Sequence, residues 1–252
     1  MIRVPYGLRI HRFLAPKKGS QPGECEDAIA FHAGRMVFAV ADGATEAYDS
    51  RSWARLFVRA WVRIQPPVFE MQEFEPFVRD LGRRLHRKWS KRKLPWYAEE
   101  KVRGGSFTAF VLLHFYIAGV TLHWKASALG DCCLIHRRNL TDCNAFPITR
   151  SEEFGSHPIL LPSIESKQRR ALDSVQHASG AAEPGDDFLL VSDAVGCWFL
   201  KQRENGEGET TRLFDRLTES NDADGLQNFF GDLRSTGQIR NDDIAVVRIE
   251  VY

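Results

Sequence analysis

The sequence predicts an α+β fold in which helices and antiparallel sheets form separate layers. Apolar segments with the pattern of strands occur in hairpin-linked groups, at 28–41 and again at 105–138. Segments with helical periodicity come in pairs between such groups, at 49–64 with 71–93 and at 211–219 with 223–235. One-for-one alternation of strands and helices would indicate a doubly wound parallel sheet, whereas this grouping favours a layered sandwich.

The first predicted elements are two paired strands, 28–32 and 36–41, joined by a turn at Ala33-Gly34. A helix is predicted over 49–64, where Asp49 or Ser50 can cap it. Its apolar residues stand at 53, 56, 57, 60, 61 and 64, which is the spacing of one helix face. The second helix, 71–93, carries such a face in Phe74, Phe77, Val78, Leu81, Leu85 and Trp89.

Strand-like patterns then fill 105–138, and "DDFLLVSDA" (186–194) and "DDIAVVRIEVY" (242–252) predict two further strands. The segment between them, 139–185, is rich in Pro, Ser, Gly and charge, and is expected to be an irregular, flap-like insertion. Since no long Gly, Ser or Pro linker divides the chain, a single domain is expected over 1–252.

Composition narrows the classes of function. Hydrophobic residues make up 43% and charged residues 27% of the 252 residues, as in ordinary globular proteins. A net charge of +1 gives no general attraction to polyanions, so nucleic acid is not an expected partner. No uninterrupted apolar segment is long enough to cross a membrane. Five cysteines without framework spacing indicate a reducing, cytoplasmic location, and a monomer is expected.

Acidic residues stand where several predicted strands meet turns. Asp42 follows "VFAVA", Asp193 follows "FLLVS", Asp242 precedes "DIAVV", and Glu26-Asp27 precedes "AIAF". Aspartate is common at such junctions because it caps backbone N–H groups. If the strands are neighbours, however, the carboxylates converge, and a hard divalent cation would relieve their repulsion. Spacing leaves both interpretations open.

Six fragments between residues 23 and 250 together resemble the type 2C metal-dependent protein phosphatases, in a divergent, bacterial-like form. In order they are "GECEDAIAF", "VADGATE", "GGSFTAFVLL", "ASALGDCCLI", "FLLVSDAVGCW" and "RNDDIAVVRI". The resemblance implies a four-layer αββα sandwich, in which two packed antiparallel β-sheets are flanked by helix pairs. It also implies a protein serine/threonine phosphatase with a binuclear Mn²⁺ or Mg²⁺ centre, and a phosphorylated protein as substrate.

The resemblance further implies which residues form the site. Asp42, Asp193 and Asp242 would be the catalytic residues, with Asp42 bridging the two ions and the carbonyl of Gly43 binding one of them. Within "DDI" the first acidic residue matches, which favours Asp242 over Asp243. The remaining implied metal-site residues are Glu26 and Asp27, through water, and Asp131 at a third, weaker site. Two such ions would activate a water molecule and stabilise the phosphoryl oxygens.

The sequence also departs from the family. Pro22 stands where an arginine usually holds the phosphate, and Lys17, Lys18, Arg51 and Arg103 are alternatives among which the sequence does not choose. "DG" is followed by Ala44-Thr45-Glu46, without the usual Gly-Gly or His, Ala194 follows Asp193, and Cys197 stands at a position that is acidic in relatives. These departures motivate a second hypothesis, a catalytically weak or inactive phosphatase fold that binds phosphoproteins as a regulatory module.

Three other patterns in the sequence are typical of different kinds of functional site. Cys132 and Arg138 have the Cys-x5-Arg spacing of tyrosine phosphatases, but their segment alternates like a strand and has no glycine. Cys133 and His136 lack a second pair with zinc-ligand spacing. The basic run 83–93 indicates a solvated helix face, with a docking surface for an acidic phosphoprotein or a nucleic acid as the alternative; its cations are Arg83, Arg84, Arg87, Lys88, Lys91, Arg92 and Lys93.

Overall fold

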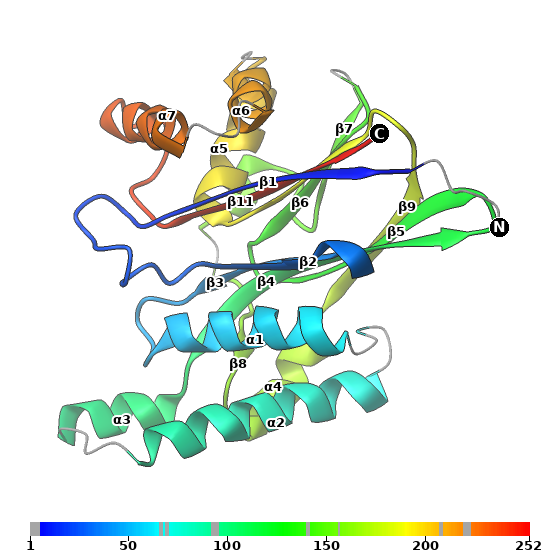
Figure 1. The fold of residues 1–252 in the computed structure, drawn as a ribbon. Coiled ribbons are helices and arrows are strands. Elements are labelled where there is room, and N and C mark those ends of the chain that lie inside the picture. Colours follow the sequence, from blue (N-terminus) through cyan, green and yellow to red (C-terminus); the bar gives the residue numbers. More distant parts are fainter. Residues whose placement is uncertain are drawn as a thin grey trace.

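Two antiparallel sheets pack face to face and lie between two layers of helices, as Figure 1 shows. This computed structural model describes residues 6–65, 68, 71–91, 96–139, 142–155, 157–206, 209–218 and 223–252. The α+β class and the four-layer αββα arrangement expected from the sequence are confirmed. Apolar strand residues alternate between the two faces of each sheet, so each sheet buries one face against its partner and the other against helices.

The first sheet has the strand order β1-β11-β10-β6-β7. Its strands are β1 (Leu8–Ala15), β11 (Ile244–Val251), β10 (Asp187–Val191), β6 (Cys133–Arg137) and β7 (Cys143–Phe146). The two ends of the chain are therefore paired, with Leu8 opposite Val251 and Ala15 opposite Ile244. Strand β1 was not predicted, because His11 and Arg12 interrupt its apolar pattern.

The second sheet has the strand order β2-β3-β4-β5-β9. Its strands are β2 (Ala28–His32), β3 (Val37–Gly43), β4 (Phe107–Ala118), β5 (Thr121–Leu129) and β9 (Gln176–Ala182), and β8 (Leu161–Pro162) pairs with β4. A 3-10 turn at Ala33–Arg35 joins β2 to β3, at the predicted Ala33-Gly34 turn.

Helices cover the outer face of each sheet. Those beside the second sheet are α1 (Ser50–Ile64), α2 (Met71–Trp89), α3 (Trp96–Gly104) and α4 (Glu165–Leu172). Those beside the first sheet are α5 (Asp193–Glu204), α6 (Glu209–Thr218) and α7 (Ala223–Ser235). Among the described residues, no helix combines the length and apolar character needed to cross a membrane.

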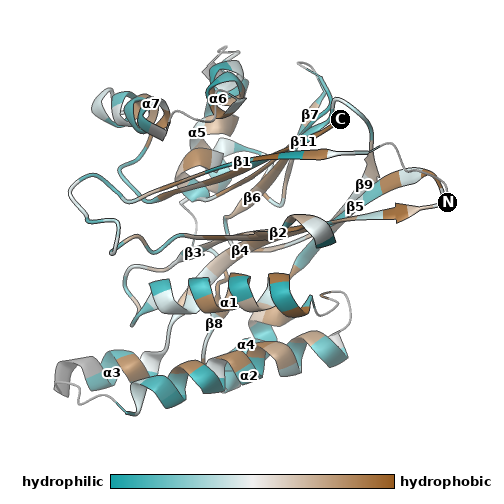
Figure 2. Cartoon of the chain, in the orientation of Figure 1, coloured by the Kyte–Doolittle hydropathy of each residue, from teal (hydrophilic) through white to brown (hydrophobic). Residues whose placement is uncertain are grey.

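The core is built in three apolar layers. Phe38, Phe115 and Phe188 lie between the sheets, where Phe115 and Phe188 meet edge to face at 4.9 Å between ring centroids. The predicted stripe of α1 packs on the second sheet, with Trp53 and Phe57 fully buried. Figure 2 shows the same division, because the strands are mostly brown while the outward faces of the helices are teal.

Several elements differ from the sequence prediction. The segment 139–185 is more regular than expected, since it contains β7, β8, α4 and β9. Strand β9 was missed because its small, polar residues (QHASGAA) carry no apolar alternation. Helix α5 was missed because seven of its residues are buried, so an amphipathic stripe is absent from its sequence. Helix α2 ends at Trp89; of the predicted extension, residues 92 and 93 lie outside the described residues.

Candidate functional site

The strand registers bring five aspartates to one end of the sandwich. In the second sheet Ala28 lies opposite Ala41, so Asp27 and Asp42 stand at the same end of neighbouring strands. In the first sheet Val191 lies opposite both Cys133 and Val246. Because antiparallel neighbours alternate in direction, Asp193 after β10 meets the residues that precede β6 and β11, which include Asp131 and Asp242.

A cavity of about 180 Å³ opens at this end, between the two sheets. Four of its lining residues are predicted metal-site aspartates, and a fifth is Gly43. The complete lining is Asp42, Gly43, Ala44, Thr45, Ala109, Asp131, Pro158, Leu160, Asp193 and Asp242. The structure therefore brings together most of the predicted site residues in one small, largely acidic space.

Asp27 lies against Asp42 behind the cavity wall. Both side chains are deeply buried, and the two carboxyl groups are close enough to share a hydrogen bond. Burial raises the pKa of Asp42 well above its ordinary value, and the negative charges of Asp27, Asp193, Asp131 and Asp242 raise it further. Burial likewise raises the pKa of Asp27, whose carboxyl group is hydrogen-bonded to Ser192. The oxygen Oδ2 of Asp27 is buried and has no hydrogen-bond partner among the described residues.

Two of the lining aspartates contact a cation that is not itself part of the cavity lining. The guanidinium of Arg240 donates a hydrogen bond to the carboxylate of Asp193, and its Nε lies 3.5 Å from Oδ2 of Asp242. Burial nevertheless raises the pKa of Asp193. Burial and the charge of Asp193 raise the pKa of Asp131 to about 6. The pKa values of Asp131 and Asp193 are thus raised even with Arg240 in place, which indicates that their negative charge is unfavourable here and that a cation would stabilise it.

The neighbouring acidic residues Glu26 and Asp243 lie outside the cavity lining. Asp243 Oδ1 accepts a hydrogen bond from the backbone N–H of Lys17 (2.7 Å), and its Oδ2 accepts one from that of Glu26 (2.6 Å). Asp243 thereby fastens both ends of the loop between β1 and β2. The side chain of Glu26 is hydrogen-bonded to Thr45, which lines the cavity, and burial raises the pKa of Glu26.

Backbone contacts fix the end of β3. The hydroxyl of Thr108 donates a hydrogen bond to the carbonyl oxygen of Asp42 (2.7 Å). A Cβ on Gly43 would lie 2.9 Å from the backbone carbon and oxygen of Ser50, the first residue of α1. Glycine is thus required here because the helix approaches the strand end directly, a reason that the sequence alone did not indicate.

The donor set suits a hard divalent cation. Mn²⁺ and Mg²⁺ prefer carboxylate oxygens. Four carboxyl groups line the cavity, and a fifth, that of Asp27, has a buried oxygen without a hydrogen-bond partner among the described residues. Among the described residues, no group of three His, Cys, Asp or Glu side chains has the arrangement of ligands around a metal ion. Arg240 is hydrogen-bonded to Asp193, and the carboxyl groups of Asp27 and Asp42 lie against each other, so an ion would replace these contacts on binding.

Pro22 stands where relatives have a phosphate-binding arginine, and none of the four cations that could replace this arginine lines the aspartate cavity. Lys17 and Lys18 line a separate cavity beside α7. Arg51 belongs to the first turn of α1, and Arg103 is exposed near the end of α3. Sequence reasoning missed Arg240, which contacts two of the aspartates. Its position two residues before Asp242 was the signal that could have identified it.

The alternative sites considered from sequence receive no support. Cys132 is fully buried, and burial together with the charge of Asp42 raises its pKa well above the ordinary value, which disfavours the thiolate. Nε2 of His136 lies 3.0 Å from Oδ2 of Asp186, and its ring stacks on Phe188. Cys197 lies one helical turn after Asp193, with its Sγ 3.9 Å from the carbonyl oxygen of Ser151.

Comparisons with known proteins agree with this geometry. A family model described as Protein phosphatase 2C matches residues 19–231. Comparison with curated protein sequences gives no match. A structure described as PppA, a key regulatory component of T6SS in Pseudomonas aeruginosa, is similar with a TM-score of 0.57 and 17% identity, over 97% of this chain and 98% of that chain.

Two further structures are of PstP. Its catalytic domain in complex with 2 manganese ions has a TM-score of 0.56 and 16% identity, over 98% of this chain and 99% of that chain. The PstP/Ppp serine/threonine phosphatase of Mycobacterium tuberculosis has a TM-score of 0.56 and 18% identity, over 96% of this chain and 98% of that chain. At these identities the likeness concerns the fold.

Proposed function

This chain belongs to the protein phosphatase 2C family, and on that premise we propose that it is a metal-dependent phosphatase acting on phosphoserine or phosphothreonine in proteins. One observation carries the proposal: Asp42, Asp131, Asp193 and Asp242, from four separate strand ends, line one cavity with Asp27 directly behind them. Structural aspartates at turns would be scattered, whereas the charges of Asp27, Asp131, Asp193 and Asp242 all raise the pKa of Asp42.

The residues that would hold two Mn²⁺ or Mg²⁺ ions are Asp42, with the carbonyl of Gly43, on one side, and Asp193 and Asp242 on the other. When bound, such ions supply activation of a water molecule and stabilisation of the phosphoryl oxygens. Glu26 and Asp27 would hold water ligands, and Asp131 would serve a third, weaker ion. The use of Asp243 as a backbone clamp supports Asp242 as the ligand of the pair.

The chain itself contributes charge and shape. Ala109, Pro158 and Leu160 give the cavity an apolar side that limits the access of bulk water. The planar guanidinium of Arg240 has the geometry to bind a phosphoryl group through two N–H donors. Because Arg240 is about half exposed at the cavity, it is the cation best placed to take the role that the arginine at position 22 has in relatives. A cytoplasmic location and a monomeric state are parts of this proposal.

The test is hydrolysis of phosphoserine and phosphothreonine peptides with Mn²⁺ and with EDTA. We expect turnover that requires Mn²⁺ and falls at least about a hundredfold in Asp42→Asn, since one bridging ligand is lost. Binding is measured in parallel by the Mn²⁺-dependent shift in melting temperature, which Asp42→Asn should reduce. Full turnover in EDTA, or in Asp42→Asn, would contradict the proposal.

A second candidate is a regulatory module that binds phosphoproteins without hydrolysing them. The contact of Arg240 with both Asp193 and Asp242 favours it, because a guanidinium there competes with metal ions for the same carboxylates. This candidate predicts phosphopeptide binding without turnover at any Mn²⁺ concentration. Metal-dependent turnover of any of the peptides excludes it.

A further inference from the structure

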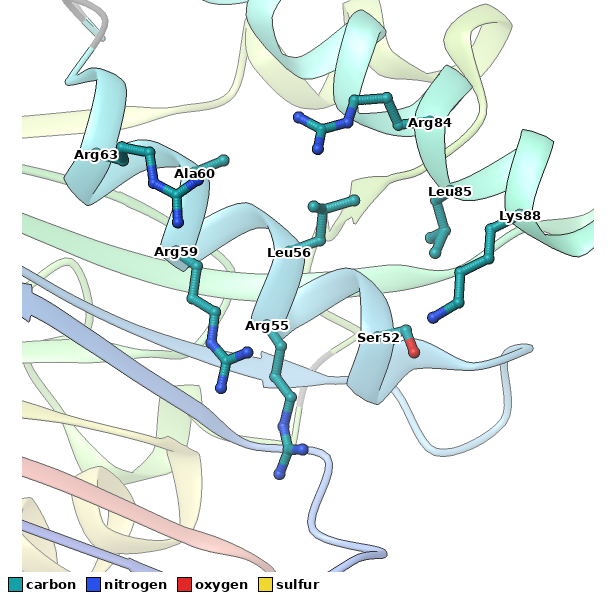
Figure 3. Close-up of a pocket in the computed structure, with 9 residues that line it drawn as sticks. All are labelled: Ser52, Arg55, Leu56, Arg59, Ala60, Arg63, Arg84, Leu85 and Lys88. Atoms are coloured by element: carbon teal, nitrogen blue, oxygen red, sulfur yellow. The ribbon is translucent and has the colours of Figure 1, made fainter.

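A basic groove lies between α1 and α2, two of the helices beside the second sheet. Its volume is about 460 Å³, and Figure 3 shows the side chains around it. Five of its nine lining residues are cations, and no Asp or Glu is among the nine. The lining is Ser52, Arg55, Leu56, Arg59, Ala60, Arg63, Arg84, Leu85 and Lys88.

The cations come from two helices. Arg55, Arg59 and Arg63 are four residues apart on α1, so they form one row along its axis. Arg84 and Lys88 form a second row on α2, and Leu56, Ala60 and Leu85 lie between the rows (Figure 3). The basic run 83–93 is therefore divided: Arg83 forms an ion pair with Glu165 at 2.9 Å, whereas Arg84 and Lys88 belong to the groove.

The charge in the groove is not balanced locally. Burial lowers the pKa of Arg55, and the neighbouring cations Arg51 and Arg59 lower it further. Four of the five cations (Arg59, Arg63, Arg84 and Lys88) are exposed, so they are free to reach a ligand. An anionic ligand would relieve this repulsion between like charges.

One end of the groove lies at the start of α1, which approaches Gly43 of the aspartate cavity. Ser52 lies two residues after Ser50, whose backbone would meet a Cβ on Gly43 at 2.9 Å. Lys88 precedes Trp89, whose indole Nε1 donates a hydrogen bond to the carboxylate of Asp49 (2.9 Å), just before α1. The groove thus begins near the turn that follows Asp42 and extends along α1 from there.

The dimensions suit an extended peptide. Residues four apart on a helix are separated by about 6 Å along its axis, and alternate residues of an extended chain by about 6.6 Å. From Ser52 to Arg63 the helix rises about 16 Å, the length of about five extended residues. No residue among the nine is aromatic, so the groove offers no stacking platform for the bases of a single-stranded nucleic acid.

We propose that this groove binds an acidic segment of the phosphoprotein substrate, with carboxylates at alternating positions paired to Arg55, Arg59 and Arg63 and enclosed by Arg84 and Lys88. The inference rests on the proposed phosphatase function and adds to it the class of substrate. The groove acts by docking, and it leaves the chemistry at the aspartate cavity unchanged.

The test compares a groove variant, Arg59→Glu with Arg84→Glu, and a control variant with the same change in charge, Arg87→Glu with Lys91→Glu. Arg87 and Lys91 are exposed and lie outside the groove lining. The probe is an unphosphorylated, fluorescently labelled peptide with glutamate at alternating positions, and binding is measured by anisotropy. We expect the groove variant to weaken binding about tenfold, and the control variant to change it less than about twofold.

Activity separates this inference from the proposed function. With a small aryl phosphate as substrate and Mn²⁺ present, the wild type and both variants should have equal rates. With phosphopeptides, an acidic segment should lower KM in the wild type and in the control variant, and the groove variant should lose this advantage. If no phosphate ester is hydrolysed but the peptide binds as expected, the proposed function fails and the docking groove stands.

Three results would overturn the groove. They are absence of peptide binding by the wild type, equal weakening in both variants, and tighter binding of a mixed-sequence single-stranded oligonucleotide than of the peptide at the same ionic strength. The third result would assign the groove to nucleic acid, because the weakening by Arg59→Glu with Arg84→Glu would then report phosphate contacts.

Discussion

Arg240 donates a hydrogen bond to the carboxylate of Asp193, so a cation of the chain contacts one of the aspartates that line the cavity. The same guanidinium lies 3.5 Å from Asp242. Arg240 therefore offsets part of the negative charge of the clustered carboxylates, and it is also a candidate to bind the phosphate of a substrate.

Replacing Arg240 by alanine should strengthen Mn²⁺ binding and weaken substrate binding. Removal of a competing cation from the largely buried Asp193 is expected to lower the Kd for Mn²⁺ about fivefold, which corresponds to about 1 kcal/mol. Isothermal titration calorimetry measures this change, and KM for a phosphopeptide should rise at the same time. Arg9→Ala is the control, since Arg9 pairs with Glu250 on β11. Unchanged or weaker Mn²⁺ binding in Arg240→Ala would refute the competition.

Asp131→Asn should change how the stability of the metal-free protein depends on pH. The pKa of Asp131 is raised from 3.8 to about 6 in the folded protein, so the folded state holds this proton more tightly than the unfolded state. Stability from this group is complete below about pH 4 and declines as the pH rises to about 6, where the loss levels off. Asparagine removes that loss.

The gain in Asp131→Asn is therefore expected to increase between about pH 4 and pH 7, by up to about 3 kcal/mol of unfolding free energy. Urea denaturation in EDTA at several pH values provides the measurement. Asp80→Asn, on the exposed surface of α2, is the control and should show no such trend. A difference between variant and wild type that stays constant with pH would contradict the raised pKa.

Gly43→Ala should destabilise the protein, because its Cβ would lie 2.9 Å from the backbone of Ser50 and neither backbone is free to move. We expect a loss of about 1–3 kcal/mol in unfolding free energy, together with weaker Mn²⁺ binding, since the carbonyl of Gly43 would be displaced. Gly231→Ala is the matched control. Its Cβ meets nothing within 4 Å in α7, so the helix should be unaffected or slightly stabilised.

Asp242→Asn and Asp243→Asn should have opposite profiles. Asp243 accepts hydrogen bonds from the backbone of Lys17 and Glu26, so its replacement is expected to cost about 1–3 kcal/mol of stability. Asp242 lines the cavity, and its replacement should mainly weaken Mn²⁺ binding, at least about tenfold. Denaturant unfolding and calorimetry together separate the two. The reverse pattern would make Asp243 the ligand.

Much of the architecture followed from local patterns. The helix α1 can be predicted from its apolar stripe, because only one of its faces is buried. The strands β3, β4 and β11 can be predicted from continuous apolar runs, because both of their faces are buried. Strand β1 was not predicted from the sequence. Its polar residue His11 is buried because β1 pairs with β11, which is distant in sequence, and local patterns do not indicate such a pairing. The regular structure within 139–185 was not predicted for a similar reason, since β9 forms by pairing with β5 and not through a pattern of its own.

The candidate site divides in the same way. Asp42, Asp193 and Asp242 were identified by motif, and the registers explain why residues so far apart in sequence meet. The position of Arg240 and the clamp made by Asp243 depend on side-chain rotamers within a loop, which no spacing rule specifies. The groove between α1 and α2 required the relative placement of two helices, although two of its five cations, Arg84 and Lys88, belong to a run that the sequence already singled out.

The pairing of β1 with β11 has a practical consequence for handling the protein. Gly7 and Tyr252 exchange two backbone hydrogen bonds, and both lie at the end of the first sheet opposite Asp242. A label or surface tether attached at Tyr252 would therefore lie at the far end of the sheet from the aspartates. Phosphopeptides could then be presented to protein immobilised through this end of the first sheet.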